Sequence, residues 1–220
     1  MAMTGLTGVA ARTAARPRAA AVVADADPGV LARVTQPGVA AAIWQRTLDP
    51  ALMRWLEATA PQNLPRCRMA LPVGDVGRAV DAACGIAGLP PSPERAALAA
   101  DAQDLARRFA AIMAAPAVAL RLEAVTTNAC RRFHVDHMPA RLLCTYRGQA
   151  TQYGVPGPKG EVAAPAALAT GWVGLFRGSL WPGEETALLH RSPPIEGSGE
   201  TRLLLVLDVV GPDASDHGHC

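Results

Sequence analysis

The hydrophobic period of this chain changes from helical to alternating near Val118, and this change constrains the fold more than any other feature. From Ala117 to Thr126, apolar and polar positions alternate, as is typical of a strand with one wet face. Further short apolar segments follow, separated by turns and without a helical pattern between them. The expected strands are Arg132–Asp136, Arg141–Arg147, Gly171–Gly178, Leu188–His190 and Thr201–Val210. Short strands at this density predict an antiparallel sandwich or barrel.

The segment before this change carries two clear helix starts. Ser92-Pro93-Glu94 places an N-cap serine before a proline at the first helical position, and Asp49-Pro50 repeats the arrangement. A shorter helix is expected over Val76–Ile86. The apolar run Val39–Arg46 fits either a strand or a buried helix, because periodicity alone does not separate the two. We therefore predict an α+β fold, with a helical N-terminal half packed on a C-terminal double-stranded β-helix, or jelly roll.

Composition excludes some classes of partner. A formal net charge of +2 gives no reason to expect nucleic acid or an anionic membrane as a partner. No stretch approaches the ~20 consecutive apolar residues of a membrane-spanning helix. The five cysteines are odd in number and lack CxxC spacing, which favours reduced thiols over a disulfide framework. We expect a cytoplasmic protein.

Two histidines and one aspartate are placed to meet around a metal ion. Successive side chains alternate between the faces of a strand, so His134 and Asp136 are expected to point the same way. His190 on a neighbouring strand would supply a third ligand. Two histidines and one carboxylate are the ligand set of non-haem Fe(II) oxygenases. The alternative is that both histidines are structural and that Asp136 is a turn residue.

The expected domain boundaries follow from these patterns. They are a mobile N-terminal tail (1–36), a helical support region (37–116), a jelly-roll metal-binding core (117–211) and a tail (212–220). The first tail is basic, with no acidic residue before Asp25, so a targeting role is an alternative. The final tail is expected to be disordered, with loose metal chelation through Asp213–Cys220 as the alternative.

The order of these motifs resembles the core of the Fe(II)/2-oxoglutarate-dependent dioxygenases. The resemblance covers about residues 121–208 and includes His-x-Asp, a Gly-x-x-x-x-Phe-x-Gly strand, a distal His before Pro-Pro, and an Arg opening the last apolar strand. It implies His134, Asp136 and His190 as ligands of Fe(II), and Arg202, twelve positions after His190, as the residue that binds the far carboxylate of 2-oxoglutarate. Thr145 or Tyr146 would add a hydroxyl donor to that carboxylate.

The longer motifs CRRFHVDHMPARLLCTYRG and LLHRSPP are similar to a bacterial family of unknown function whose members often neighbour zinc-responsive genes. This similarity implies metal homeostasis as a setting. Four further residues stand near the expected site. His137 is expected in a turn or beside the ligands, Arg191 competes with Arg202 as the carboxylate anchor, and Cys130 and Cys144 are either inert buried thiols or ligands that would favour zinc.

Two functional classes remain open from the sequence. One is an oxygenase that uses 2-oxoglutarate as a small-molecule co-substrate and hydroxylates an unknown small molecule or protein side chain. The other is a non-catalytic zinc-binding protein of metal homeostasis with the same cupin-like fold. A non-metallic interaction module is a third possibility.

Overall fold

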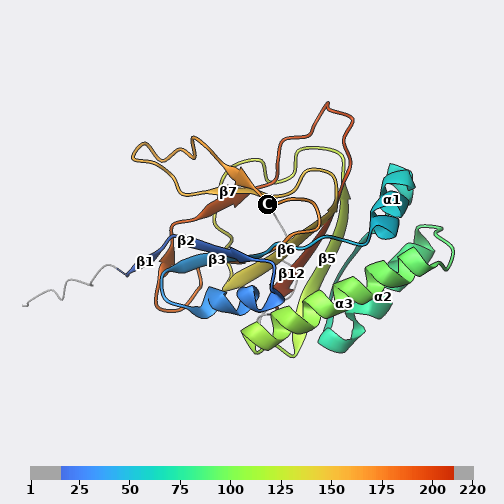
Figure 1. Cartoon of the computed structure of the whole chain (residues 1–220), viewed down its shortest axis with the longest axis horizontal. Helices are drawn as coiled ribbons and strands as arrows, with labels where there is room; N and C mark the ends of the chain where they lie inside the picture. The colour runs from blue at the N-terminus through green and yellow to red at the C-terminus, as the bar shows by residue number, and fades with distance from the viewer. Residues whose placement is uncertain (1–15, 211–220) are drawn as a thin grey trace, which may run out of the picture.

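A seven-stranded mixed sheet runs through the computed structural model, which describes residues 16–210 (Figure 1). Its strands lie in the order β2-β3-β9-β6-β12-β5-β4. The bounds of these strands are β2 Ala21–Asp25, β3 Val39–Trp44, β4 Cys67–Pro72, β5 Ala117–Val125, β6 Ala140–Arg147, β9 Val173–Arg177 and β12 Arg202–Val209. The last strand in sequence, β12, therefore lies inside the sheet, antiparallel to both β5 and β6.

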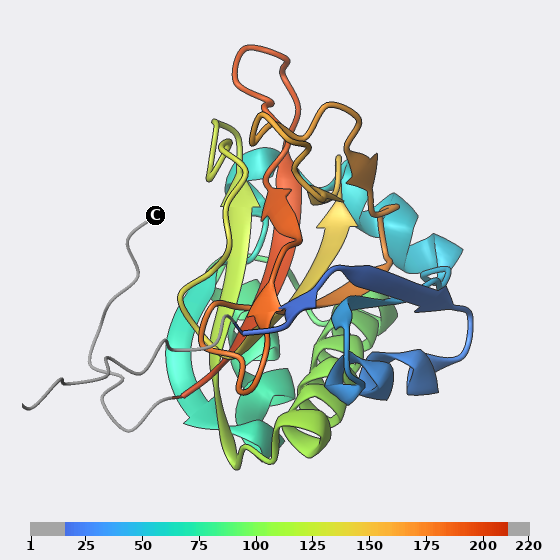
Figure 2. The ribbon, with the colours of Figure 1, turned by 90° about the vertical axis from the view of Figure 1, so that its left-hand side faces the viewer.

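Early segments of the chain contribute three strands to this sheet. β2 runs parallel to β3, and β3 pairs with β9, which comes much later in the sequence (Figure 2). β4 pairs with β5 at the opposite edge. The expected helical N-terminal half is therefore corrected to a mixed one. The apolar run from Val39 resolves as a strand, and β4 lies in a segment for which no strand was predicted.

Part of the expected N-terminal tail has regular structure. In addition to β2, residues 16–36 contain β1 (Arg18–Ala19) and the 3-10 helix η1 (Pro28–Thr35), whose N-cap Asp27 accepts a hydrogen bond from the backbone of Gly29. Residues 1–15 and the C-terminal tail from residue 211, with its proposed chelating groups, lie outside the described residues.

Three α-helices cover one face of the main sheet. They are α1 (Pro50–Ala58), α2 (Val76–Ile86) and α3 (Pro93–Met113), accompanied by the short 3-10 helices η2 (Pro61–Asn63) and η3 (Val73–Asp75). Both expected N-caps are confirmed: Asp49 accepts a hydrogen bond from the backbone of Ala51, and Ser92 accepts one from Arg95. α3 packs Leu98, Leu105 and Phe109 into the core shared with the sheet.

A small sheet faces the other side of the main sheet, opposite the α-helices (Figure 1). Its order is β11-β7-β8, with bounds β7 Gln152–Gly154, β8 Ala166–Ala167 and β11 Leu189–Arg191, and a separate parallel pair joins β1 to β10 (Glu185–Thr186). Side chains of β12 alternate between the two layers. Leu203, Leu205 and Leu207 belong to the helix-facing core, whereas Leu204 and Val206 belong to the core under the small sheet.

The described chain is thus an α+β structure built around one large sheet. Among residues 16–210, no helix is both long and apolar enough to cross a membrane. Cys67, Cys84 and Cys144 have free thiols, whereas Cys130 forms a disulfide, so among residues 16–210 the expectation of reduced cysteines holds for three of the four. Cys220 lies outside the described residues.

Candidate metal centre

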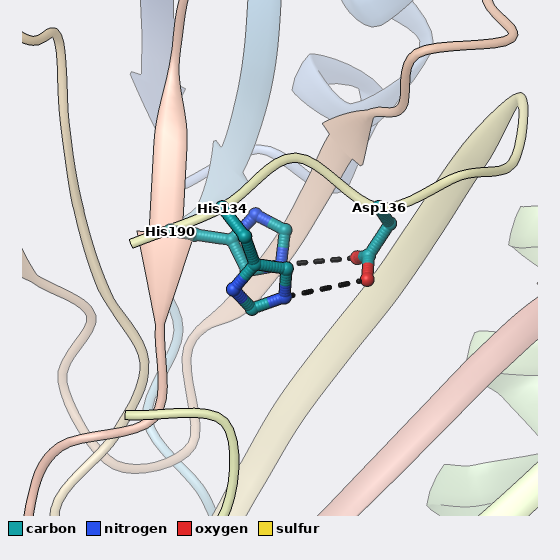
Figure 3. Close-up of side chains that lie close together, drawn as sticks. All are labelled: His134, Asp136 and His190. Carbon is teal, nitrogen blue, oxygen red and sulfur yellow. Dashed lines mark ion pairs between the residues drawn. The ribbon is translucent and has the colours of Figure 1, made fainter. Parts of the chain in front are cut away.

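His134, Asp136 and His190 converge between the two sheets (Figure 3). One potential ligand atom from each lies within 4.8 Å of the others. Nε2 of His190 is 3.0 Å from Oδ2 of Asp136, and Nε2 of His134 is 3.5 Å from Oδ1 of the same carboxylate. Two imidazole nitrogens and a carboxylate that face one point form a ligand set suited to a divalent transition metal.

The backbone around His134 does not form the strand expected over Arg132–Asp136. Only His134 pairs, through two 3.0 Å hydrogen bonds with the backbone of His190 on β11. Two residues later, the carbonyl of Asp136 accepts a hydrogen bond from Ser179, which follows β9 of the main sheet. Because this segment crosses from one sheet to the other, it cannot continue a single hydrogen-bonded ladder.

The turn after β9 holds the segment that carries Asp136. Gly178 donates to the carbonyl of Pro139, and Leu180 donates to that of Met138. The two backbones approach so closely that a Cβ atom on Gly178 would lie 2.0 Å from the Met138 carbonyl oxygen and 2.7 Å from that of Asp136. A glycine at this position therefore permits the contact that places the aspartate.

Hydrogen bonding orients the first imidazole. Nδ1 of His134 lies 2.8 Å from the carbonyl oxygen of Arg132, which only accepts, so Nδ1 carries the proton. In the neutral ring, Nε2 is then unprotonated and faces Asp136, as a metal ligand requires. His190 is 5% exposed, and its ring centroid lies 5.1 Å from that of Phe176 on β9.

The electrostatics of the site favour a negative Asp136. Burial raises the pKa of this carboxyl group, but His134, His190 and Arg141 outweigh burial and hold the pKa well below its usual range. Hydrogen bonding to Asp136 in turn raises the pKa of His134. Oδ2 of Asp136 is buried without a well-oriented hydrogen bond from any group in residues 16–210, although His190 is close. A cation held here would satisfy that oxygen, so the residues fit a metal ion.

Two residues beside the cluster, Arg141 and Asp208, were not predicted from the sequence. Arg141, at the start of β6, donates from Nη1 to Oδ1 of Asp136 at 2.6 Å. Its Nε and Nη2 atoms bind Asp208 of β12 at 2.7 and 2.8 Å. The sequence held one signal for this pair. Asp208 is a single acidic residue at the end of the apolar run Leu203–Leu207, and Arg141 is an arginine at the start of another expected strand.

Arg202 and Thr145 lie on the same face of the main sheet as Arg141 and Asp208. Arg202 is 0% exposed, and its Nε donates to the carbonyl of Gln149. Its Nη1 and Nη2 atoms have no hydrogen-bond partner within residues 16–210, and neither does the hydroxyl of Thr145. Thr145 is paired directly with Leu204, two residues after Arg202. Burial lowers the pKa of Arg202 to about 10, so the side chain remains charged at neutral pH.

The structure places Tyr146 and Cys144 on the opposite face of the sheet from the metal centre. The Tyr146 hydroxyl donates to Asp101 of α3 at 2.6 Å, so its candidate role as a carboxylate donor is not supported. Cys144 lies beside Arg46, and burial raises the pKa of its thiol to about 12. This thiol is therefore protonated and remote from the three ligands.

The other candidates lie around the centre. Nδ1 of His137 is 3.1 Å from the Ser179 hydroxyl, and His137 is not among the converging ligands. Arg191 binds Gln152 through Nε and stacks 4.4 Å from the ring centroid of Phe133. Cys130 and Arg191 line a small pocket beside His134 and His190, with a floor of Leu143, Leu204 and Val206.

The fold is that of known dioxygenase structures. A rice dioxygenase for auxin oxidation aligns with a TM-score of 0.51 and 15% identity, over 87% of this chain and 83% of that one. The 2-oxoglutarate binary complex of dioxygenase for auxin oxidation 1 from Arabidopsis thaliana aligns with a TM-score of 0.52 and 11% identity, over 89% and 94%. At such identities the likeness concerns the fold. The molecule is therefore an α+β protein with a fold similar to that of these dioxygenases and with a His-Asp-His cluster.

The amino-acid sequence assigns this chain to a family. Residues 25–208 match the family described as "Protein of unknown function (DUF1826)", and the chain belongs to this family. No curated protein matches it.

Proposed function

We propose that this protein is a non-haem Fe(II)/2-oxoglutarate-dependent oxygenase that hydroxylates a substrate not yet known. His134, Asp136 and His190 would hold the metal. Arg202 and Thr145 would bind the far carboxylate of 2-oxoglutarate, the small-molecule co-substrate. We also propose that the two facing sheets correspond to a double-stranded β-helix.

The observation that carries this proposal is the buried guanidinium of Arg202. Leaving a buried polar group without a partner costs about 1–3 kcal/mol, and more for a charged group. Within residues 16–210 both terminal nitrogens lack partners, while Nε donates to the carbonyl of Gln149. Two parallel N–H groups match the two oxygens of a carboxylate, and the unpartnered Thr145 hydroxyl lies on the same face.

The protein residues would bind and orient the reactants. Three protein ligands leave three coordination positions, enough for a 2-oxo acid chelate and O₂. Fe(II) held there would activate O₂, which is the oxidant, for hydroxylation of a C–H bond, with 2-oxoglutarate oxidised and decarboxylated as the co-substrate. Arg202 fixes the distance of the co-substrate from the centre, and apolar Leu143 and Val206 limit water beside it.

A zinc-binding role without turnover is the alternative function. The position of Cys144 does not favour it, because this thiol lies beyond the sheet from the three ligands. The setting in metal homeostasis and the cytoplasmic location remain predictions.

Anaerobic titration of the Fe(II)-loaded protein with 2-oxoglutarate tests the proposal. We expect saturable binding that requires Fe(II), accompanied by a weak visible charge-transfer band. Arg202→Met should weaken 2-oxoglutarate binding at least tenfold, because each hydrogen bond to a charged group contributes about 1.5–3 kcal/mol.

Arg191→Met is the matched control, since Arg191 is the other arginine close to the ligands, and it should leave the affinity unchanged. Tight Zn²⁺ binding with no response to 2-oxoglutarate would support the alternative. Loss of 2-oxoglutarate binding in Arg191→Met, with binding retained in Arg202→Met, would show that Arg191 binds the carboxylate.

A further inference from the structure

We propose that Arg141 and Asp208 act as a positioning pair that reserves one oxygen of Asp136 for the protein and leaves the other for the metal. This inference rests on the part of the proposed function in which the His-Asp-His cluster holds a divalent cation. It does not depend on 2-oxoglutarate. Neither residue would touch the metal, and both would act through Asp136.

The geometry divides the two carboxylate oxygens of Asp136. Oδ1 accepts a 2.6 Å hydrogen bond from Nη1 of Arg141, a buried charge-assisted contact. Oδ2, in contrast, lacks a well-oriented hydrogen bond in the described chain and lies 3.0 Å from Nε2 of His190. The oxygen nearest the second histidine is therefore the one left for a cation.

Asp208 fixes the guanidinium that makes this division. It pairs directly with Arg141 across β12 and β6, and both of its oxygens bind the guanidinium, at 2.7 and 2.8 Å. Binding along the Nε–Nη2 edge fixes the plane of the guanidinium, and therefore the directions of its three remaining N–H groups. One of these, on Nη1, points toward Asp136.

Charge balance explains why the arginine does not repel a cation. Arg141 alone would cancel the charge of Asp136 and leave the histidines as the principal attraction for a metal. With Asp208 included, Asp136, Arg141 and Asp208 together carry a net charge of −1, and the neighbouring Arg121 is itself paired with Glu123 at 3.6 Å. Asp208 is thus expected to support metal binding without being a ligand.

The division also matters for the coordination number. A carboxylate bound through one oxygen gives three protein ligand atoms and leaves three positions open. A carboxylate free to bind through both oxygens would occupy a fourth position. By holding Oδ1, Arg141 would keep open the positions that a chelating co-substrate and O₂ require.

Co(II) binding to the full chain tests the pair, because the visible bands of bound Co(II) report its coordination. We expect Asp208→Asn to weaken Co(II) binding by about 10- to 100-fold, the usual effect of losing a group that orients a metal ligand. Arg141→Lys keeps the charge but cannot contact both carboxylates as a fork does. It should change the position and intensity of the Co(II) bands.

Asp101→Asn is the matched control. Asp101 binds Arg46 at 2.5 and 2.7 Å, in a similarly buried pair against the helix-facing side of the same sheet. It should lower thermal stability while leaving Co(II) affinity and bands unchanged.

The possible results distinguish failure of the metal centre from failure of the positioning role. If the wild-type protein does not bind Co(II), the metal centre itself fails, and this inference fails with it. If the wild type binds but Asp208→Asn binds within twofold as tightly, or no more weakly than Asp101→Asn, the positioning role is wrong. Unchanged Co(II) bands in Arg141→Lys would overturn the division of the oxygens, even if Asp208→Asn were too unstable to measure.

Discussion

At Arg202 and Thr145 the protein buries polar atoms that meet no partner within residues 16–210. Most buried polar groups in folded proteins are hydrogen-bonded, so two such residues on one face of a sheet require an explanation. A bound carboxylate would satisfy both. The stability given up in the free protein would then be recovered when the co-substrate binds.

Replacing Thr145 with valine tests this interpretation. Valine has a similar shape without the hydroxyl, so the free protein should be equally stable or slightly more stable in urea denaturation. The affinity for 2-oxoglutarate should fall about tenfold, because one hydrogen bond to a charged group is lost.

Thr170→Val should give the opposite pattern, since the Thr170 hydroxyl already donates to the carbonyl of Gly148 at 2.8 Å. That variant should lose stability and keep its affinity. If Thr145→Val binds 2-oxoglutarate like the wild type, Thr145 has no part in the carboxylate site.

Among the elements, the turn after β9 determines where Asp136 lies. Three backbone hydrogen bonds join residues 178–180 to residues 136–139, and Gly178 lies against two carbonyl oxygens of that segment. The aspartate is thus placed by the main sheet, while His134 and His190 are tied to the small sheet. The His-Asp-His cluster forms only when both sheets are correctly apposed.

Gly178→Ala should therefore displace the Asp136 segment. The added Cβ would lie 2.0 Å from the Met138 carbonyl oxygen, so the backbone must shift. We expect Co(II) affinity to fall by about tenfold or more, as for other losses of ligand orientation, with retention of the circular dichroism spectrum of the folded protein.

Gly74→Ala provides the control, because a Cβ there meets nothing within 4 Å and no positive φ is involved. Equal Co(II) affinity in the two variants would show that the turn does not position the ligand.

Elements with strong local signals were predicted correctly, whereas those defined by distant partners were not. Ser92-Pro93 gave the start of α3, and strict alternation gave β5, because capping and periodicity are local properties. β3 was left open between a strand and a buried helix, and β4 was not predicted, since such segments become strands only through their pairing partners.

The convergence of His134, Asp136 and His190 was predicted by an argument that was only partly right. Strand parity placed His134 and Asp136 on one side, but the backbone between them is irregular and crosses between sheets. Strand parity could not show that Tyr146 faces α3. It shows that neighbouring side chains point to opposite faces, but not which face is covered by helices. Arg141 and Asp208 were missed because their pairing depends on the register of two strands far apart in sequence.

At the scale of the whole molecule, metal binding should stabilise the fold. His134, Asp136 and His190 come from segments that hold the two sheets together, so a cation held by them would bind the folded state and not the separated segments. At a metal concentration 100 times the Kd, the stabilisation is about 2.7 kcal/mol. For a protein of this size, this corresponds to a rise in Tm of about 5–10 °C.

Thermal denaturation with and without Co(II) measures this effect. His190→Ala should abolish the rise, because it removes the only proposed ligand that lies outside the 134–136 segment. A rise of equal size in His190→Ala would mean that the cation stabilises the protein from another site.

The interior position of β12 has a consequence for biosynthesis. Without residues 202–209, the strand order falls into two separate pieces, β2-β3-β9-β6 and β5-β4. A nascent chain must therefore keep two incomplete sheet fragments, each with an open edge, until residues 202–209 have been translated. The main sheet is completed only when β12 pairs with β5 and β6, which lie far from it in sequence. We therefore expect slow folding and dependence on chaperones.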